Sequence, residues 1–248
     1  MENSEKSPVI LITGAAKRIG AAIARHLHSQ GARVILHYRD SETAALALQN
    51  ALETERPRST ARIQSDLRDT PGLRTLASRA IAAFGRLDGL VNNASGFYPT
   101  PQGRVDETQW DDLMGSNLKA PFFLSQALAP ELARHGGAIV NLADVHGQKP
   151  LKDHPVYSIA KAGLIMMTQS LAKELGPDVR VNAVAPGAIL WPETNPDAAV
   201  QQAILDRTAL KRPGTPEGIA AAVAFLLLKA PYITGQILAV DGGRSLNL

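Results

Sequence analysis

The sequence predicts an α/β fold in which helices flank both faces of one doubly wound parallel sheet of about seven strands. Short apolar runs such as Val9-Ile10-Leu11-Ile12 are typical of parallel strands that are buried on both faces. The longer segments between these runs repeat apolar residues at helical spacing, as Ile23 and Leu27 do. Such an alternation suits one domain that covers residues 1–248, with right-handed crossovers between its strands.

Residues that favour the ends of helices divide the chain in the same way. Gly31 is a candidate C-cap, Ser41 is a plausible N-cap, and Pro71 and Gly85 suit the start and the end of one helix. The pair Gly136-Gly137 ends a longer helix. The expected strands cover residues 9–12, 33–38, 60–64, 87–91, 138–142, 179–185 and 236–240. The expected helices cover residues 19–29, 41–54, 71–84, 106–134, 156–175 and 215–228.

Composition excludes several classes of protein. The chain has no cysteine, which excludes a disulfide scaffold, a thiolate zinc site and a cysteine nucleophile. We find no metal-ligand spacing among the other residues and expect no metal. The first apolar run is too short for a signal peptide, and the longest, residues 219–228, is far shorter than the roughly 20 residues that span a bilayer. We therefore expect a cytoplasmic protein with a flexible N-terminus at residues 1–7.

The basic residues gather in one segment. The chain holds 26 Lys and Arg against 23 Asp and Glu, yet five basic residues and no acidic one lie between Lys17 and Arg39. A nucleic-acid site is one explanation, but elsewhere charges of both signs are interspersed. The segment begins within the turn from Thr13 to Gly20, which joins the first strand to the first helix. Although such a turn also occurs for packing alone, this Rossmann-type arrangement suits a pyrophosphate at a helix N-terminus.

Arg39 follows the second expected strand, where an adenine ribose would lie. Arginine there suits the 2′-phosphate of NADP, whereas an acidic residue would suit the 2′-hydroxyl of NAD. A solvated loop charge is the alternative explanation, and the neighbouring Asp40 and Glu42 could repel a phosphate. The pattern favours NADPH and leaves the strictness of that preference open.

Tyr157 and Lys161 are four residues apart, one turn along the same face of an expected helix. An ammonium group beside a phenol favours the phenolate and lowers the pKa of the tyrosine, which can then pass a proton near neutral pH. The spacing alone can arise by chance. After a dinucleotide-binding opening, it indicates a catalytic pair.

These residues resemble the short-chain dehydrogenase/reductase family. The resemblance implies hydride transfer with a nicotinamide cofactor, with Tyr157 as the proton donor and Lys161 on the nicotinamide ribose. It also implies that Asn117 holds a helix kink and a relay water, and that Asp66 binds the adenine. The matching motifs run in order along nearly the whole chain: Thr13-Gly14 to Gly20, Asp66-Leu67, Asn92-Asn93-Ala94, Asn117, Tyr157 with Lys161, Pro186-Gly187 and Asp241-Gly242-Gly243.

Two departures from the family pattern are informative. Arg18 stands where the phosphate loop usually has its middle glycine, and Asp144 stands where the catalytic serine usually lies, 13 residues before Tyr157 (157 minus 144). In both positions the chain resembles the pteridine reductases within the family. It also resembles them at His37-Tyr38 and in the loop from Asn93 to Pro101.

The resemblance to pteridine reductases implies that Phe97 stacks on a pterin whose other face meets the nicotinamide. It implies further that Ser95 and Arg18 bind the pterin and the cofactor phosphates, and that Ser41 helps to bind the 2′-phosphate. A carboxyl group such as that of Asp144 can orient or protonate the ring nitrogens of a pterin, whereas a ketone needs a neutral hydroxyl. Ordinary loop packing of Phe97 and a capping role for Asp144 are the alternatives.

The expected site has three parts. The catalytic residues are Asp144, Tyr157, Lys161 and Asn117. The cofactor residues are Gly14, Lys17, Arg18, Ile19, Gly20, His37, Tyr38, Arg39, Ser41, Asp66, Leu67, Asn93, Ala94, Ser95, Lys161, Pro186, Gly187 and Ile189. The substrate residues are Arg18, Ser95, Phe97, Asp144, Tyr157 and Trp191. His146 and His154 flank this region and are expected to be merely solvated.

We therefore expect an NADPH-dependent reductase of a pterin or dihydropterin, with dihydrobiopterin, dihydromonapterin and dihydrofolate as candidates. A carbonyl reductase of 3-oxoacyl type and a non-catalytic NADP(H)-binding sensor remain the alternatives. Residues 190–210 form the expected substrate loop, and residues 190–196 are the best candidate for a mobile segment within it. The resemblance implies a homotetramer assembled through two long helices and the C-terminal segment. From the interspersed charges and the short apolar runs, we expect no nucleic acid and no membrane as partner.

Overall fold

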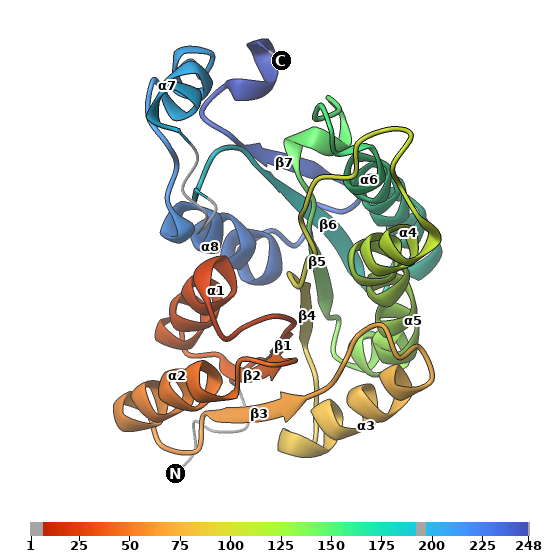
Figure 1. The fold of residues 1–248 in the computed structure, drawn as a ribbon. Coiled ribbons are helices and arrows are strands. Elements are labelled where there is room, and N and C mark those ends of the chain that lie inside the picture. The colour runs from red at the N-terminus through yellow and green to blue at the C-terminus, as the bar shows by residue number, and fades with distance from the viewer. Residues whose placement is uncertain (1–6, 192–196, 248) are drawn as a thin grey trace.

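The computed structural model describes residues 7–191 and 197–247. Within them, seven strands form one parallel sheet in the order β3-β2-β1-β4-β5-β6-β7 (Figure 1), which confirms the predicted fold. Strand β1 pairs with β2 from Val9 opposite Arg33, and with β4 from Ile10 opposite Gly89. The strands are β1 (Val9–Ile12), β2 (Arg33–Tyr38), β3 (Thr60–Gln64), β4 (Gly89–Asn92), β5 (Ala138–Leu142), β6 (Arg180–Pro186) and β7 (Ile237–Val240).

Helices cover both faces of the sheet because successive strand residues point to opposite faces. Along β1, Ile10 and Ile12 join the apolar core on one face, whereas Val9 and Leu11 join the core on the other. The first core lies under α1 (Arg18–Ser29), α2 (Glu42–Glu55) and α8 (Pro216–Ala224). The second lies under α3 (Gly72–Phe84), α5 (Ala120–Arg134) and α6 (Pro155–Leu175), on the right of Figure 1, and α4 (Glu107–Met114) packs beside α6.

The single helix predicted over residues 106–134 is wrong in one respect: a π-helical turn, Gly115–Lys119, separates α4 from α5. At this turn the N–H of Ala120 donates to the carbonyl of Gly115, five residues back. Pro121 has no N–H for the carbonyl of Asn117, and the Asn117 side chain donates 2.9 Å to the carbonyl of Leu113. Both effects favour an interruption at Asn117, the residue from which a kink was expected.

Helix α7 (Ala198–Asp206) was not predicted, since its residues were assigned to the substrate loop. None of its side chains is buried, and it begins with Asp197 accepting from the N–H of Ala199. Residues 192–196 of the expected mobile segment and residues 1–6 of the expected flexible N-terminus lie outside the described residues.

Most other boundaries agree with prediction within two residues. Gly85 ends α3 with a left-handed φ of 74°, as the C-cap pattern predicted. Ser41 stands at the N-cap of α2, but its side chain makes no capping hydrogen bond there. The helix predicted to end at residue 228 changes from α8 to a π-helical turn over Phe225–Lys229. In the part of the chain that the structure covers, no helix is both long and apolar enough to cross a membrane.

Candidate active site

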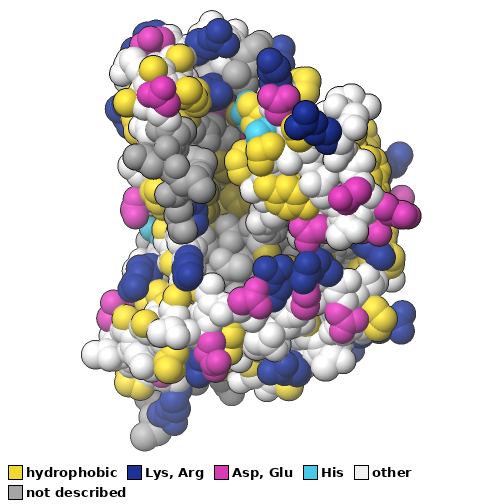
Figure 2. All heavy atoms as spheres, in the orientation of Figure 1, with side chains coloured by type: hydrophobic (Ala, Val, Ile, Leu, Met, Phe, Trp, Pro, Cys, Tyr) yellow, Lys and Arg dark blue, Asp and Glu magenta, His cyan; other side chains and the backbone are white. Residues whose placement is uncertain are grey.

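A cavity of about 800 Å³ opens at the carboxyl ends of β1 to β4, where open α/β sheets bind ligands. Figure 2 shows a hollow on this face, bordered above by apolar side chains and below by Lys, Arg, Asp and Glu side chains. Many predicted site residues line the cavity: Gly14, Lys17, Arg18, Ile19, Gly20, His37, Tyr38, Arg39, Ser41, Asp66, Leu67, Asn93, Ala94, Ser95, Phe97 and Tyr157.

The turn between β1 and α1 is fixed by close backbone contacts. Gly14 has a φ of +62°, and the amide of Asn93 donates to the carbonyls of Thr13 at 2.8 Å and Gly14 at 3.1 Å. A Cβ on Gly20 would lie 2.1 Å from the Gly14 carbonyl oxygen. This second glycine is therefore required by packing inside the turn, before any ligand is considered.

His37 supports the same turn from β2. Its Nδ1 accepts the N–H of Gly14 at 3.2 Å, so its Nε2 carries the proton and donates to the carbonyl of Ser65 at 3.1 Å. Burial lowers the pKa of His37 to about 4, which keeps the ring neutral at physiological pH. The residue was expected to contact the cofactor, and the structure gives it a second task in holding the Gly14 backbone.

Arg18 reaches across the cavity mouth. It adopts a left-handed φ of 52°, which costs a non-glycine residue about 1 kcal/mol. Its guanidinium donates to the carbonyl of Trp191 at 3.4 Å. Trp191 itself was expected on the substrate, and the structure places its backbone against the phosphate loop.

The ribose end of the cavity combines both signs of charge. Arg39 donates to the carboxylate of Asp40 at 2.5 Å, with the two side chains 50% and 72% exposed. Arg39 thus lies where the 2′-phosphate was expected, but its nearest partner is the acid that was expected to oppose such a phosphate. The Ser41 hydroxyl lines the cavity and makes no capping bond, so its position fits phosphate binding.

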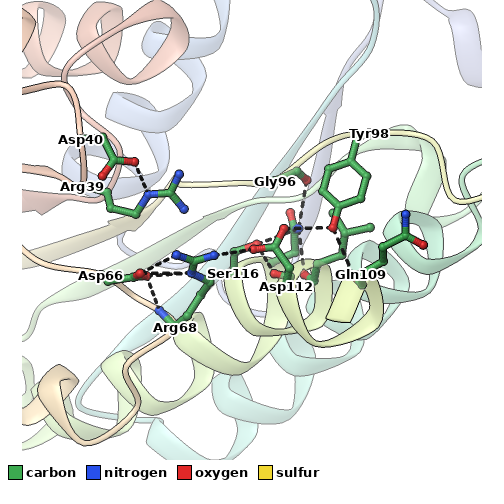
Figure 3. A network of polar contacts seen from close by, with 11 residues as sticks. Arg39, Asp40, Asp66, Arg68, Gly96, Tyr98, Gln109, Asp112 and Ser116 are labelled. Carbon is green, nitrogen blue, oxygen red and sulfur yellow. Dashed lines mark hydrogen bonds and ion pairs between the residues drawn. The ribbon is translucent and has the colours of Figure 1, made fainter. Parts of the chain in front are cut away.

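Asp66 lies in a network that was not predicted (Figure 3). The guanidinium of Arg68 donates to both of its carboxylate oxygens, with contacts of 2.6 to 3.1 Å. These bonds lower the pKa of Asp66 to about 2. Arg68 also contacts Asp112 at 3.0 Å, and Asp112 accepts from the Tyr98 hydroxyl at 3.0 Å. An adenine at Asp66 would have to share the carboxylate with Arg68.

Tyr157 is 5% exposed, and its hydroxyl donates 2.8 Å to Oδ2 of Asp144. The other oxygen, Oδ1, accepts the N–H of His146 at 2.8 Å at the start of a short 3-10 turn. Asp144 therefore both caps this turn and faces the tyrosine. Burial first, and then the negative charge and hydrogen bond of Asp144, raise the pKa of Tyr157 well above its usual value.

The expectation that Lys161 lowers the pKa of Tyr157 is thus wrong for this structure. The Lys161 ammonium lies 5.6 Å from the centre of the tyrosine ring and donates 2.7 Å to the carbonyl of Leu142. Burial lowers its own pKa to about 8. The two residues do share a helix face, but burial and the nearby carboxylate outweigh the lysine.

Asn117 connects the π-helical turn to the loop after β4. Its amide donates 3.0 Å to the carbonyl of Gly96, and its oxygen accepts the Ser95 hydroxyl at 2.6 Å. The side chain is buried. It therefore holds the loop that brings Ser95 and Phe97 to the cavity.

Phe97 is 48% exposed and lies between two rings. Its edge-on contact with Tyr157 has a centroid distance of 4.8 Å, and it stacks on His154 at 4.9 Å and 13°. His154, expected to be merely solvated, is fixed by this stacking and by a 2.9 Å bond to the carbonyl of Lys152. One face of Phe97 is thus covered by the protein, so a pterin would have to use the other.

Seven of the predicted site residues are not among the described residues that line the cavity: Asn117, Asp144 and Lys161, and, from the end of β6 onward, Pro186, Gly187, Ile189 and Trp191. Gly187 packs instead against β7, where a Cβ would lie 2.7 Å from the Asp241 Cα. Sequence reasoning missed Arg68, Asp112 and Ser116, which do line the cavity, and it noted Tyr98 only as part of the loop from Asn93 to Pro101. The spacing of Asp112 and Ser116, four apart just before Asn117, was an available signal.

Comparisons with known proteins cover nearly the whole chain. A family model described as enoyl-(acyl carrier protein) reductase matches residues 14–245. Pteridine reductase 1 of Leishmania tarentolae is 39% identical, with 100% of this chain and 99% of the relative covered. The putative ketoacyl reductase 2 of the granaticin polyketide synthase of Streptomyces violaceoruber is 35% identical, with 98% of both chains covered. A 3-oxoacyl-(acyl-carrier-protein) reductase of Staphylococcus aureus is 37% identical, with 94% of this chain and 96% of the relative covered.

Proposed function

The chain belongs to the short-chain dehydrogenase/reductase family of oxidoreductases, which use a nicotinamide cofactor, and from this premise we propose that it reduces a pterin or dihydropterin with NADPH. Dihydrobiopterin, dihydromonapterin and dihydrofolate are the candidate substrates. The protein acts in this proposal as one NADP-binding domain over residues 1–248 and as a homotetramer. Similarity to pteridine reductase 1 supports the substrate class, but relatives named as oxoacyl reductases have similar identity.

The observation that carries the proposal is the 2.8 Å hydrogen bond between Tyr157 and Asp144. A carbonyl substrate develops negative charge on its oxygen, and a carboxylate beside that oxygen would repel it. A pterin offers N–H donors and basic ring nitrogens, which a carboxylate accepts or stabilises when they are protonated. Asp144 at this place therefore favours a nitrogen heterocycle over a ketone.

The chain's own residues supply the proton. Because the pKa of Tyr157 is raised, the phenol is protonated at neutral pH and can donate to a ring nitrogen. Asp144 holds the hydroxyl in place, and Lys161, held by the Leu142 carbonyl, keeps a positive charge behind the pair. Phe97 provides an apolar face for a flat ring against Tyr157.

Several residues fit the phosphates of NADPH, which when bound supplies the hydride. Lys17 and Arg18 lie at the N-terminus of α1, where backbone N–H groups and the helix dipole favour anions. Arg39 and Ser41 line the ribose end and suit a 2′-phosphate. For this binding, Arg39 must be shared with or released from Asp40.

Carbonyl reduction is the second candidate, because the matching family model and two of the reported relatives carry names of acyl-carrier-protein or ketoacyl reductases. The two candidates differ in what they require of residue 144. A carbonyl reductase gains from a neutral hydroxyl there, so replacing Asp144 by Ser should help it. A pterin reductase should lose activity by the same change.

The test mixes the protein with NADPH and, separately, each dihydropterin and a 3-oxoacyl thioester, and follows the absorbance of the reduced nicotinamide. We expect turnover of at least one dihydropterin, faster with NADPH than with NADH, and a loss of this activity in Asp144→Ser. The exposed Asp178→Ser serves as the matched control. Turnover of the thioester alone would overturn the substrate class. Cofactor binding without any turnover would support a sensor instead.

A further inference from the structure

A row of charged and polar contacts follows the wall of the cavity from the end of β3 to the loop after β4 (Figure 3). Arg68 binds Asp66 with one side of its guanidinium and Asp112 with the other, at 2.6 Å and 3.0 Å. Asp112 lies on α4 and accepts the hydroxyl of Tyr98. Together these side chains join the expected adenine end of the cavity to the loop expected to hold the pterin.

We propose that Arg68, Asp112 and Tyr98 are positioning residues that couple cofactor binding at Asp66 to the placement of the substrate loop. The inference rests on the function proposed above. It goes beyond that function in assigning specific residues to the coupling between the two ends of the cavity. None of the three is required to touch the reacting atoms.

Arg68 connects Asp66 to Asp112. Its backbone N–H donates 3.0 Å to Oδ1 of Asp66, and its guanidinium forks over the same carboxylate, so the two residues move as one unit. Its remaining Nη1 faces Asp112. A ligand that takes part of the hydrogen-bonding capacity of Asp66 leaves Arg68 more strongly bound to Asp112. The Asp66 end therefore influences the α4 end through one rigid planar group.

The loop that carries Phe97 lies at the other end of this row of contacts. Two contacts hold it on either side of Phe97: Asn117 binds the carbonyl of Gly96, and Asp112 binds Tyr98. The Tyr98 hydroxyl has one proton, and the charged carboxylate at 3.0 Å is a better acceptor than the carbonyl of Gln109 at 3.3 Å. Any shift of Asp112 thus moves one of the two supports beside the Phe97 ring, which touches Tyr157.

The contacts are partly exposed, with Arg68 45% and Asp112 28% accessible, so each pair alone has a modest effect. Arg68 and Tyr98 share no hydrogen bond with each other, but both bind Asp112. If the contacts are coupled, the effects of substitutions at Arg68 and at Tyr98 are therefore not additive, whereas independent supports give additive effects. By linkage, coupling must also appear from both ends of the cavity.

The experiment is a double-mutant cycle with Arg68→Lys, Tyr98→Phe and the double variant. The measured quantities are KM for the dihydropterin at saturating NADPH, kcat, and the Kd for NADPH, measured by fluorescence titration without a pterin. We expect each single change to raise the dihydropterin KM by about 3- to 10-fold, with a smaller change in kcat, and the double variant to be no worse than the larger single effect. Asp112→Asn, which keeps an acceptor for Tyr98 and loses the charge facing Arg68, replaces Tyr98→Phe in the cycle if that variant does not fold.

The matched controls are Arg79→Lys, on the exposed side of α3, and Tyr232→Phe, whose side chain is fully exposed. Both should leave the three constants unchanged. If Arg68→Lys leaves the dihydropterin KM unchanged, or if the two effects simply multiply, the coupling is overturned while the proposed function stands. If the wild-type protein reduces no dihydropterin, the proposed function fails and this inference fails with it.

Discussion

His37 gives the most direct test of how the sequence builds the phosphate turn. Its side chain is 2% exposed, and as a neutral ring it accepts the N–H of Gly14 and donates to Ser65. A protonated ring has two N–H groups and cannot accept the Gly14 N–H. Replacing His37 by Asn removes the titrating group but keeps a short acceptor near the Gly14 backbone.

The magnitude follows from the two pKa values. In the unfolded chain the imidazole titrates near its ordinary pKa of 6.5, whereas in the folded protein the pKa of His37 is about 4. Between these values the unfolded state binds the additional proton, so the stabilisation present above pH 6.5 is lost as the pH falls towards 4. This histidine alone should cost the wild-type protein about 2 kcal/mol at pH 5 and about 3 kcal/mol below pH 4.

The assay is urea unfolding of the wild-type protein and His37→Asn at one fixed protein concentration, at pH 7.5 and pH 5. The free energy of unfolding of the wild type should fall by about 2 kcal/mol more than that of the variant. His26→Asn on α1 is the control substitution and should keep the wild-type behaviour. Parallel losses in wild type and His37→Asn would refute the burial argument.

Three further predictions concern the same cavity. Asp144→Asn should lower the pKa of Tyr157, because the change removes the negative charge that opposes the phenolate. The titration is followed by phenol absorbance against pH, with the signal of a Tyr157→Phe variant subtracted. An unchanged titration of Tyr157 in Asp144→Asn would contradict the prediction. Asn117→Ala should cost about 3 kcal/mol in urea unfolding, since Gly96 and Ser95 lose buried partners; a loss well below 1 kcal/mol would count against it. Gly20→Ala should weaken NADPH binding about tenfold or more, as measured by fluorescence titration, because the added Cβ would lie 2.1 Å from the Gly14 carbonyl oxygen. The control Gly218→Ala should leave NADPH binding unchanged, because its Cβ would meet no atom closer than 3.7 Å.

Local patterns were sufficient for the strands and for the phosphate turn. The bounds of β1, β2, β3 and β5 are those predicted, because buried parallel strands are marked by their own apolar residues. The turn at Gly14 was readable because its glycines, its basic residues and the following helix are contiguous in sequence. The interruption at Asn117 was expected only as a kink implied by the family resemblance, and the helix was still drawn as one element over residues 106–134, although Pro121 within it removes a backbone donor.

Contacts between distant residues could not be predicted in the same way. Phe97 and His154 stack although 57 residues separate them (154 minus 97), and Arg68 meets Asp112 across 44 residues. No periodicity in the sequence records such pairs, since each depends on how elements far apart in the chain are placed around the sheet. The role of His154 in holding Phe97 therefore emerged only from the folded chain.

The Tyr157–Lys161 pair shows why spacing predicts proximity better than chemistry. The spacing placed both residues on one face of α6, yet the protonation of the phenol is decided by burial and by Asp144, which is 13 residues away in sequence (157 minus 144). A serine at position 144 would donate a hydrogen bond towards a substrate oxygen, whereas the carboxylate can only accept one when ionised. The substitution thus reverses the hydrogen-bond polarity of the site. A site of that polarity holds a protonated phenol and accepts N–H groups. We therefore expect Asp144, one of the two residues that depart from the family pattern, to select the substrates that Tyr157 protonates.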